Sequence, residues 1–318
     1  MAIHTILGAN GTIANAILPI LKEENHQIRL VSRNPKAIKG VENIKADVLN
    51  YEEVLSAVKD SDVVYLLVGI QYNAKAWARD WPKIMTHAIN ACKATNAKLI
   101  FFDNAYMYGK VDGRITEQTP YKPISKKGAV RSKVAQMLQE EINKGHIQAI
   151  IARAVDFYGP EVVEKSAPGL LVFSNLKKNK KAQWLINSNV PRTFNYVPDA
   201  ARALYLLVTT ENAYGQIWHL PTPPKALTGK EFVKEAAKHI GTSAKIVVLP
   251  KWLLKIIGLF NPFIKEMNEL NYQDEYPFEF DSSKFTTTFN FTPTSYEEGI
   301  RQTAKWFSEE YKHQEDSN

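Results

Sequence analysis

Short apolar runs alternate with helical stripes along the first half of the chain. Ile3–Leu7 is an apolar run closed by Gly8, which predicts a short buried strand. From Thr12 to Leu21 the apolar positions recur at helical spacing, which predicts a helix. The alternation continues, with strands expected at 27–32, 43–48, 62–69, 98–103 and 146–153 and helices at 51–59, 77–95 and 125–143. Such alternation predicts right-handed crossovers and a doubly wound parallel sheet.

The second half is broken by prolines into shorter pieces. A helix is expected over Val197–Thr209, followed by a short strand at Gln216–Leu220. Thr228 stands three residues before Glu231, a capping-box spacing that predicts the start of a helix ending at Ile240. The polar residues His313–Asn318 are expected to fray.

Composition and charge narrow the classes of function. The net charge of +7 includes one dense basic run, Lys177–Lys181, but no aromatic residues interleave with it. We therefore predict a solvated segment and no nucleic-acid binding. No window holds about 18 uninterrupted apolar residues, so no stable membrane insertion is expected. Cys92 is the only cysteine and lies in a helical apolar pattern, which favours a buried thiol in a reducing compartment. With no signal-peptide pattern at the start, this predicts a cytoplasmic protein.

A glycine-rich turn joins the first expected strand to the first expected helix. Gly8 permits a tight turn, Gly11 a close backbone approach, and Ala14 close packing of helix on strand. In this setting the backbone N–H groups and the helix N-terminus suit a pyrophosphate. We therefore predict a dinucleotide site that uses Gly8, Asn10, Gly11, Thr12 and Ile13.

The second expected strand ends in Ser32 and Arg33. A site that prefers NAD usually has a carboxylate here to bind the ribose hydroxyls. A guanidinium instead suits a 2′-phosphate, which a carboxylate would repel. The sequence therefore favours NADP over NAD, with a merely solvated Arg33 as the alternative.

The segment after the fifth expected strand carries the candidate chemistry. Asp103-Asn104-Ala105-Tyr106-Met107-Tyr108-Gly109 is followed by a helix that contains Ser132-Lys133. This arrangement resembles the extended short-chain dehydrogenase/reductases, the NAD-dependent epimerase/dehydratase family. The resemblance implies that Lys133 binds the nicotinamide ribose and assists catalysis. It also implies cofactor contacts from Asp47 and Val48 to adenine and from Leu67, Val68 and Gly69 to the adenosine ribose and pyrophosphate.

Two residues depart from that family's pattern. Asn104 stands where Ser or Thr orients the substrate oxygen, and Ala129 stands where a tyrosine four residues before the lysine transfers a proton. Asn104 still donates hydrogen bonds, but Ala129 cannot move a proton. Tyr106 is our first choice as a replacement, with a purely structural role as its alternative, and Tyr158 and Asp156 are weaker candidates. Tyr108 matches a structural tyrosine of the same turn.

The second half resembles the family more weakly. Asp156 lies in Arg153-Ala154-Val155-Asp156-Phe157-Tyr158-Gly159-Pro160, where the family usually has an asparagine that contacts substrate. Arg192 matches an arginine that grips a substrate phosphate in nucleotide-sugar members, although it could instead pair with a carboxylate. The apolar segment Pro250–Phe260 is expected to form a wall or lid of an apolar substrate pocket. The alternative is a helix that lies on a membrane surface, which its two lysines and small polar face disfavour. No spacing typical of a metal site is present.

These observations predict an α/β protein with a Rossmann-type doubly wound parallel sheet and a smaller C-terminal substrate-binding region. Residues 1–155 should form the NAD(P)-binding domain, residues 195–215 should return to it, and residues 156–318 should bind substrate. The favoured function is an NADP-dependent oxidoreductase or epimerase acting on a carbonyl or sugar-like small molecule. The alternative is a non-catalytic NADP(H)-binding redox sensor of the NmrA-like kind. A homodimer is compatible with either.

Overall fold

The computed structural model describes residues 2–311, which divide into two compact units. The expectation for His313–Asn318 lies outside the described residues. Unit 1 comprises the chain up to Gly109 together with Pro120–Ala154 and Ala200–Leu220. Unit 2 comprises Lys110–Thr119, Val155–Asp199 and the chain from Pro221 onward. The sequence analysis placed the first boundary at residue 155, and it did not predict that Lys110–Thr119 belong to unit 2.

Unit 1 is built on a seven-stranded sheet whose strands are all parallel, in the order β12-β7-β5-β4-β1-β2-β3. The strands are β1 (Ile3–Leu7), β2 (Gln27–Ser32), β3 (Glu42–Lys45), β4 (Val63–Leu66), β5 (Lys98–Asp103), β7 (Ala149–Arg153) and β12 (Ile217–His219). The predicted Rossmann-type fold is confirmed. The four residues of β4 are all apolar and buried, as is typical of a central strand in a parallel sheet that is covered on both faces.

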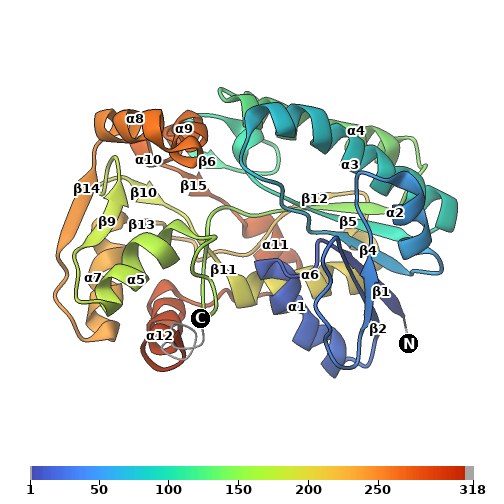
Figure 1. Ribbon diagram of the computed structural model, residues 1–318, viewed down its shortest axis with the longest axis horizontal. Coiled ribbons are helices and arrows are strands. Elements are labelled where there is room, and N and C mark those ends of the chain that lie inside the picture. Colours follow the sequence, from blue (N-terminus) through green and yellow to red (C-terminus); the bar gives the residue numbers. More distant parts are fainter. Residues whose placement is uncertain (1, 312–318) are drawn as a thin grey trace. The chain divides into compact units, whose positions relative to one another are not determined.

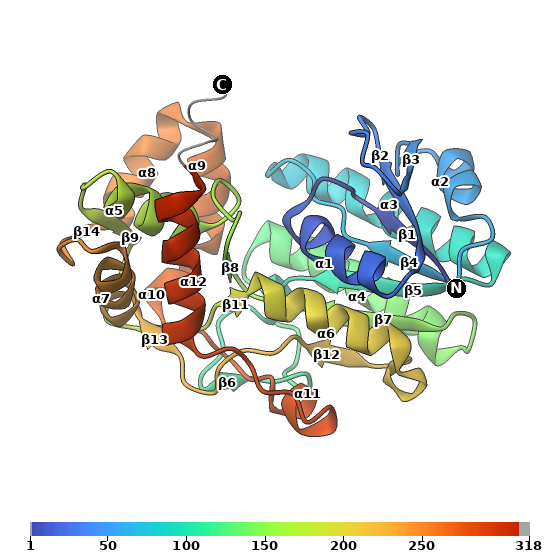
Figure 2. The same ribbon diagram turned by 90° about the horizontal axis from the view of Figure 1, so that it is seen from below.

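Helices cover both faces of this sheet (Figures 1 and 2). On one face lie α2 (Tyr51–Val58), α3 (Ala74–Thr95) and α4 (Lys126–Asn143), and on the other lie α1 (Thr12–Glu23) and α6 (Val197–Thr209). The strand order reverses at β1, between β4 and β2. In open α/β sheets, ligands bind beyond the carboxyl ends of the strands at such a reversal. The fold thus directs attention to the loops after β1, β2 and β4.

Cys92, on α3, is fully buried. Burial raises the pKa of its thiol to about 12. The prediction of a buried cysteine is confirmed.

Unit 2 consists of short elements around an aromatic core. Its strands form the pairs β10–β13, β11–β8, β14–β9 and β15–β6, of which only β10–β13 is antiparallel. These strands are β6 (Arg114–Ile115), β8 (Phe157–Tyr158), β9 (Ala182–Leu185), β10 (Pro191–Arg192), β11 (Asn195–Tyr196), β13 (Leu227–Thr228), β14 (Ile246–Leu249) and β15 (Glu279–Phe280). Its helices are α5 (Ser174–Lys177), α7 (Gly229–Ile240), α8 (Lys251–Phe260), α9 (Pro262–Met267), α10 (Tyr272–Glu275), α11 (Ser283–Thr288) and α12 (Tyr296–Glu309), with a π-helix at Pro168–Phe173. The expected capping box of Thr228 and Glu231 is present at the start of α7.

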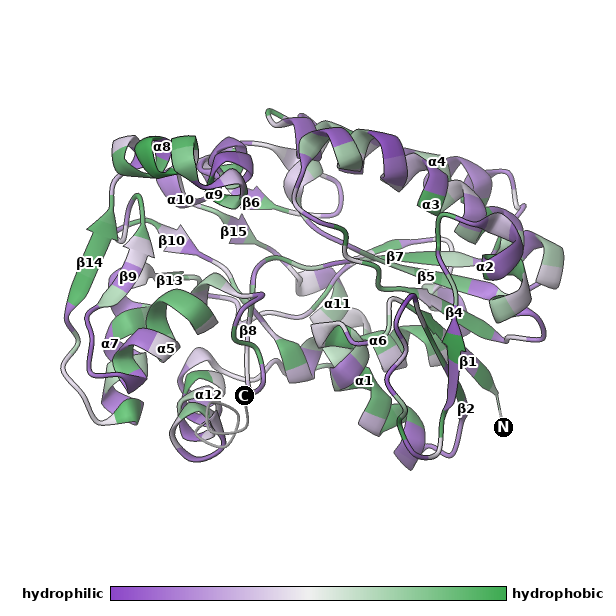
Figure 3. Ribbon diagram, viewed as in Figure 1, coloured by the Kyte–Doolittle hydropathy of each residue, from purple (hydrophilic) through white to green (hydrophobic). Residues whose placement is uncertain are grey.

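The apolar segment expected to line a pocket is α8, which follows the hydrophobic strand β14 (Figure 3). Only Leu254 and Gly258 of this helix are buried. Trp252, Leu259 and Phe260 are exposed. The described residues of α8 therefore form an apolar surface, and they line neither of the two cavities found within unit 2.

Tyr158 lies at the centre of the unit 2 core, although its hydroxyl has no hydrogen-bond partner there. Burial raises the pKa of this phenol well above its ordinary value, and the hydroxyl packs against Gly299. Tyr296, in the same core, has a hydroxyl that accepts from the Phe194 N–H at 2.9 Å and also contacts the Phe194 carbonyl. Tyr158 is therefore a core residue and is no longer a proton-transfer candidate.

These two tyrosines make a matched pair for a stability test. Tyr158→Phe removes an unsatisfied buried hydroxyl, so the free energy of unfolding should stay the same or rise. Tyr296→Phe leaves buried backbone groups of Phe194 unpaired and should cost about 1–3 kcal/mol. Urea denaturation of both variants beside the wild type tests this. A larger loss for Tyr158→Phe than for Tyr296→Phe would contradict it.

Candidate functional site

The glycine turn after β1 is held tightly between two neighbouring strands. Gly8 has φ +101°, and a Cβ there would lie 2.8 Å from backbone atoms of Leu67 and Val68 beyond β4. The N–H groups of Gly8 and Ala9 both donate to the Val31 carbonyl of β2 at 3.1 Å. No side chain fits at Gly8, so glycine is required for this approach. The carboxyl ends of β1, β2 and β4 therefore meet at this turn.

The N-terminus of α1 opens from the same turn. Its N-cap residue, Gly11, supplies no side-chain cap, and the first turn holds no acidic residue. A Cβ at Gly11 would lie only 3.3 Å from the Gly8 carbonyl. Ile13 is buried and anchors the helix on the sheet, whereas Asn10 and Thr12 are half-buried. Uncapped N–H groups at the positive end of a helix suit an anionic ligand such as a pyrophosphate.

The end of β2 lies beside this turn. The Asn10 side chain reaches the Asn34 carbonyl at 3.5 Å, next in sequence to Arg33. Arg33 is exposed, and it has no ion-pair or hydrogen-bond partner within residues 2–311. The Ser32 hydroxyl is buried and also lacks a partner within that range. This corner thus holds a guanidinium and a hydroxyl that the described protein atoms leave unsatisfied, so both are suited to a polar ligand.

The remaining expected cofactor residues lie on neighbouring loops of unit 1. The Asp47 carboxylate accepts from the Leu49 N–H at 3.0 Å, and the Val48 carbonyl bonds the His87 ring at 3.0 Å. Leu67 and Val68 are half-buried beside Gly8, and Gly69 is exposed. Asp47 and Val48 therefore have partners that fix the loop after β3.

The structure requires a correction on α4. Lys133 is exposed, and helical periodicity places it on the opposite side from Arg131. The buried face instead carries Lys127, Gly128 and Arg131. A Cβ on Gly128 would lie 2.5 Å from the Tyr106 carbonyl, so this face packs directly on the turn after β5. The two residues four positions apart that face the strand ends are Lys127 and Arg131. They lie two positions earlier in the chain than the pair that the family resemblance indicated, Ala129 and Lys133.

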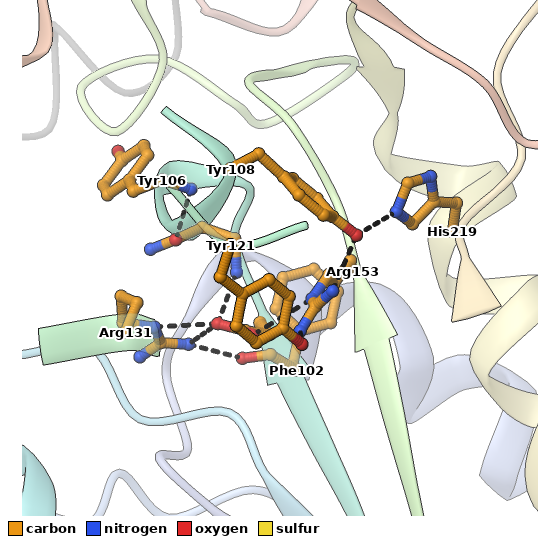
Figure 4. A network of polar contacts seen from close by, with 9 residues as sticks. Phe102, Tyr106, Tyr108, Tyr121, Arg131, Arg153 and His219 are labelled. Carbon is orange, nitrogen blue, oxygen red and sulfur yellow. Dashed lines mark hydrogen bonds and ion pairs between the residues drawn. The ribbon is translucent and has the colours of Figure 1, made fainter. Parts of the chain in front are cut away.

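Arg131 is committed to a buried ion network (Figure 4). Its guanidinium lies 2.6 Å from the Asp103 carboxylate and also bonds the Phe102 carbonyl. The other carboxylate oxygen of Asp103 meets Arg153 at 3.3 Å. Asp103, Arg131 and Arg153 are at most 3% exposed. One carboxylate at the end of β5 thus balances two buried guanidinium groups, one from α4 and one from β7.

Further contacts of Arg153 explain the role of Tyr108. Its guanidinium contacts the hydroxyls of Tyr108, at 2.6 Å, and of Tyr121, and Tyr108 also bonds His219 at 2.7 Å. Although burial opposes the charge of Arg153, Tyr108, Asp103 and Tyr121 together raise its pKa. Tyr108 is fully buried within this network, as expected for a structural tyrosine.

Asn104 and Tyr106 both belong to the turn after β5. The Asn104 side-chain oxygen accepts from the Tyr106 N–H at 3.0 Å, so the amide helps to form the turn. Tyr106 is 9% exposed, and its hydroxyl lies 2.7 Å from the hydroxyl of Tyr72, in the loop between β4 and α3. Sequence reasoning missed Tyr72, because nothing in its local pattern indicates a partner 34 residues away.

The expected substrate residues of unit 2 are bonded to each other. Arg192, on β10, lies 2.5 Å from Asp156 and also pairs with Asp274 of α10. Both terminal nitrogens of the guanidinium therefore already face carboxylates, while its buried Nε has no partner within the described residues. Of the two roles left open for Arg192, this geometry favours the pairing with carboxylates.

Within residues 2–311, one group of side chains offers donor atoms that could hold a metal ion, namely Glu235, His239 and Glu297 on the surface of unit 2. The Lys238 ammonium already bonds Glu235 at 2.8 Å and Glu297 at 3.2 Å. A lysine thus supplies the positive charge at this cluster. Among the described helices, none combines the length and the hydrophobicity of a membrane span.

Comparison with known families agrees with this geometry. The model of the NAD dependent epimerase/dehydratase family matches residues 4–220, and the chain belongs to that family. No relative among the curated proteins matches the sequence.

Several solved structures share the fold at low identity. A Bacillus cereus UDP-glucuronic acid 4-epimerase in complex with NAD is 19% identical with a TM-score of 0.75, covering 98% of this chain and 100% of its own. A Thermus thermophilus UDP-glucose 4-epimerase complex with NAD is 18% identical with a TM-score of 0.77, and it has the same coverage of both chains. A Bacillus anthracis dTDP-glucose 4,6-dehydratase in complex with NAD is 15% identical at 0.82, covering 98% of each chain.

The Asp103 network predicts that Asp103→Asn destabilises the protein far more than the loss of an exposed ion pair does. Asp103→Asn leaves two buried arginines without a counter-charge, so the free energy of unfolding should fall by about 3–5 kcal/mol. The control is Glu211→Gln, which breaks the exposed pair between Glu211 and Lys98 and should cost at most about 1 kcal/mol. Urea denaturation followed by circular dichroism measures both. Equal losses for the two variants would contradict a central role for Asp103.

Proposed function

We propose that this protein is an NADP-dependent oxidoreductase or epimerase that acts on a carbonyl or sugar-like small molecule. The glycine turn carries the proposal, because a Cβ-free backbone meets three strand ends there, beside an uncapped helix N-terminus. Gly8, Asn10, Gly11, Thr12 and Ile13 would hold the pyrophosphate. A bound nicotinamide dinucleotide would supply the hydride chemistry.

The loops around the turn would bind the rest of the dinucleotide. Asp47 and Val48 are assigned to the adenine, and Leu67, Val68 and Gly69 to the adenosine ribose and pyrophosphate. The half-buried state of Leu67 and Val68 suits contacts with a sugar face. Lys133 drops out of this assignment because its side chain points to solvent, and Lys127 is the lysine on the buried side of α4.

Arg33 is the reason for preferring NADP. It stands at the end of β2, where an NAD site places a carboxylate, and it is exposed beside the loop that Asn10 contacts. A guanidinium binds a phosphate through two parallel hydrogen bonds. The solved structures of similar fold are complexes with NAD, so proteins of this fold can bind NAD. The preference for NADP proposed for this chain rests on Arg33.

The surroundings of Arg192 decide how narrowly the substrate class is proposed. The solved relatives include epimerases and a dehydratase of nucleotide sugars, which carry a diphosphate. In this chain, Arg192 is held between Asp156 and Asp274, so the three side chains carry one net negative charge. That charge disfavours Arg192 as a phosphate clamp. The proposal therefore keeps a carbonyl or sugar-like substrate and gives Asp156 and Arg192 no phosphate contact.

The alternative, a redox sensor that binds NADP(H) without turnover, rests on α4. No tyrosine stands four residues before either buried basic residue of this helix, and Arg131 is engaged by Asp103. If that helix were the sole source of proton transfer, the protein would bind the cofactor and release it unchanged. Tight NADPH binding with no oxidation across a broad carbonyl panel would favour the sensor.

Cofactor preference is the direct test of the proposal. Fluorescence titration of the wild type should show tighter binding of NADPH than of NADH. Arg33→Ala should weaken NADPH binding about 10- to 100-fold, because a charged hydrogen bond worth roughly 1.5–3 kcal/mol is lost. Binding of NADH should change little.

Lys36→Ala, an exposed charge removed close to Arg33 in sequence, is the control and should leave both affinities nearly unchanged. A wild type that binds NADH more tightly, or an Arg33→Ala variant that keeps its NADPH preference, would remove NADP from the proposal. Failure to bind either dinucleotide would remove the proposal itself.

A further inference from the structure

Tyr72 lies on the same loop that closes the glycine turn. This loop leaves β4 through Leu67 and Val68, which pack against Gly8, and it reaches Tyr72 before α3 begins. The Trp77 indole donates to the Gln71 carbonyl at 3.0 Å, and its ring lies 5.4 Å from the ring of Tyr72. The loop is therefore pinned from both sides of Tyr72. The phenol ring is half-buried, which leaves part of it accessible to a ligand.

The hydroxyl of Tyr72 is paired with that of Tyr106 at 2.7 Å. Tyr106 is the more buried of the two, and its ring stacks on Trp77 with centroids 6.3 Å apart. Both phenols are thus held by one indole. In this pair the Tyr106 hydroxyl can donate to Tyr72, so a negative charge on Tyr72 would be stabilised by a fixed hydrogen bond.

A positive charge completes the cluster. Lys127 is fully buried in the first turn of α4, and its ammonium lies 5.9 Å from the centroid of the Tyr72 ring. The first turn is fixed because Ser125 caps the helix and Gly128 packs against the Tyr106 carbonyl. A cation this close to a phenol, away from bulk water, favours the phenolate. Tyr106 and Lys127 are two titratable groups that lie beside Tyr72.

We propose that Tyr72 is the catalytic acid and base of this protein, with Tyr106 and Lys127 as its positioning residues. The proposal rests on the proposed function. The chain lacks a tyrosine four residues before a lysine in α4. Under this proposal, the tyrosine comes from the loop after β4 and the lysine from the first turn of α4. A bound nicotinamide dinucleotide would supply or take the hydride.

The proton balance follows from this assignment. In the reducing direction, the Tyr72 O–H bond breaks and its proton goes to the substrate oxygen as the carbonyl carbon gains the hydride. The resulting phenolate is stabilised by the Tyr106 hydroxyl and by Lys127, and it regains a proton from solvent. In the oxidising direction, the phenolate takes the proton of the substrate hydroxyl.

Residue-resolved nitration tests this cluster without a known substrate. Tetranitromethane attacks the phenolate form of tyrosine, so the pH dependence of nitration at each peptide, followed by mass spectrometry, reports when that tyrosine ionises. The midpoint of the nitration–pH curve of Tyr72 should lie at least about one pH unit below that of Tyr51, which is half-buried in the same unit. NADPH should slow nitration of Tyr72 and leave Tyr51 unaffected.

Four variants separate charge from packing. Lys127→Met should move the Tyr72 midpoint up by about one pH unit, whereas Lys127→Arg should keep it low. Tyr106→Phe should also raise it, because the donated hydrogen bond is lost. Lys133→Met removes an exposed lysine of the same helix and should change nothing.

The outcomes keep this proposal apart from the proposed function. A Tyr72 midpoint equal to that of Tyr51, or one unmoved by Lys127→Met, overturns the proposal even where NADPH binds. NADPH that binds but fails to protect Tyr72 also overturns it, because the phenol would then lie away from the cofactor. A protein that fails to bind NADPH in the fluorescence titration loses its proposed function, and with it the catalytic role of Tyr72.

Discussion

The ion network around Asp103 is the interaction on which the candidate site depends. Two arginines, one on α4 and one on β7, share this single carboxylate at the end of β5. A lone buried charge is costly, so the three side chains stay together only if these elements keep their relative positions. The network therefore fixes where β5 ends. It also fixes the turn that presents Asn104 and Tyr106, and the angle at which α4 approaches that turn.

A second constraint acts at the other side of the sheet reversal. Because Gly8 has no Cβ, the turn after β1 can touch the backbone beyond β4. That contact orients the loop that carries Tyr72, while Trp77 holds the same loop from α3. The cofactor turn and the proposed proton-transfer group are therefore linked through one short stretch of backbone. Any ligand that settles against the turn also lies beside this loop.

The use of arginine at position 131 changes what α4 can contribute. A guanidinium forms several fixed hydrogen bonds at once, and here they go to Asp103 and to the Phe102 carbonyl. Arg131 also lies over the Trp81 and Phe101 rings, at 4.2 and 4.7 Å. Such a residue stabilises the unit but cannot move toward a ribose. Lys127, one turn earlier, has its ammonium 5.9 Å from the centroid of the Tyr72 ring.

Local sequence patterns were sufficient for the elements and for the glycine turn. The strand–turn–helix at Ile3–Glu23 and the capping box at Thr228 depend on residues close in sequence, so their chemistry can be read directly. The register of α4 could not be read in this way, because a helix with basic residues at 126, 127, 131 and 133 does not reveal its buried face until it packs. The pairing of Arg192 with Asp274, and of Tyr72 with Tyr106, joins residues 82 and 34 positions apart. Only the tertiary structure decides such contacts, since chain folding rather than spacing brings those side chains together.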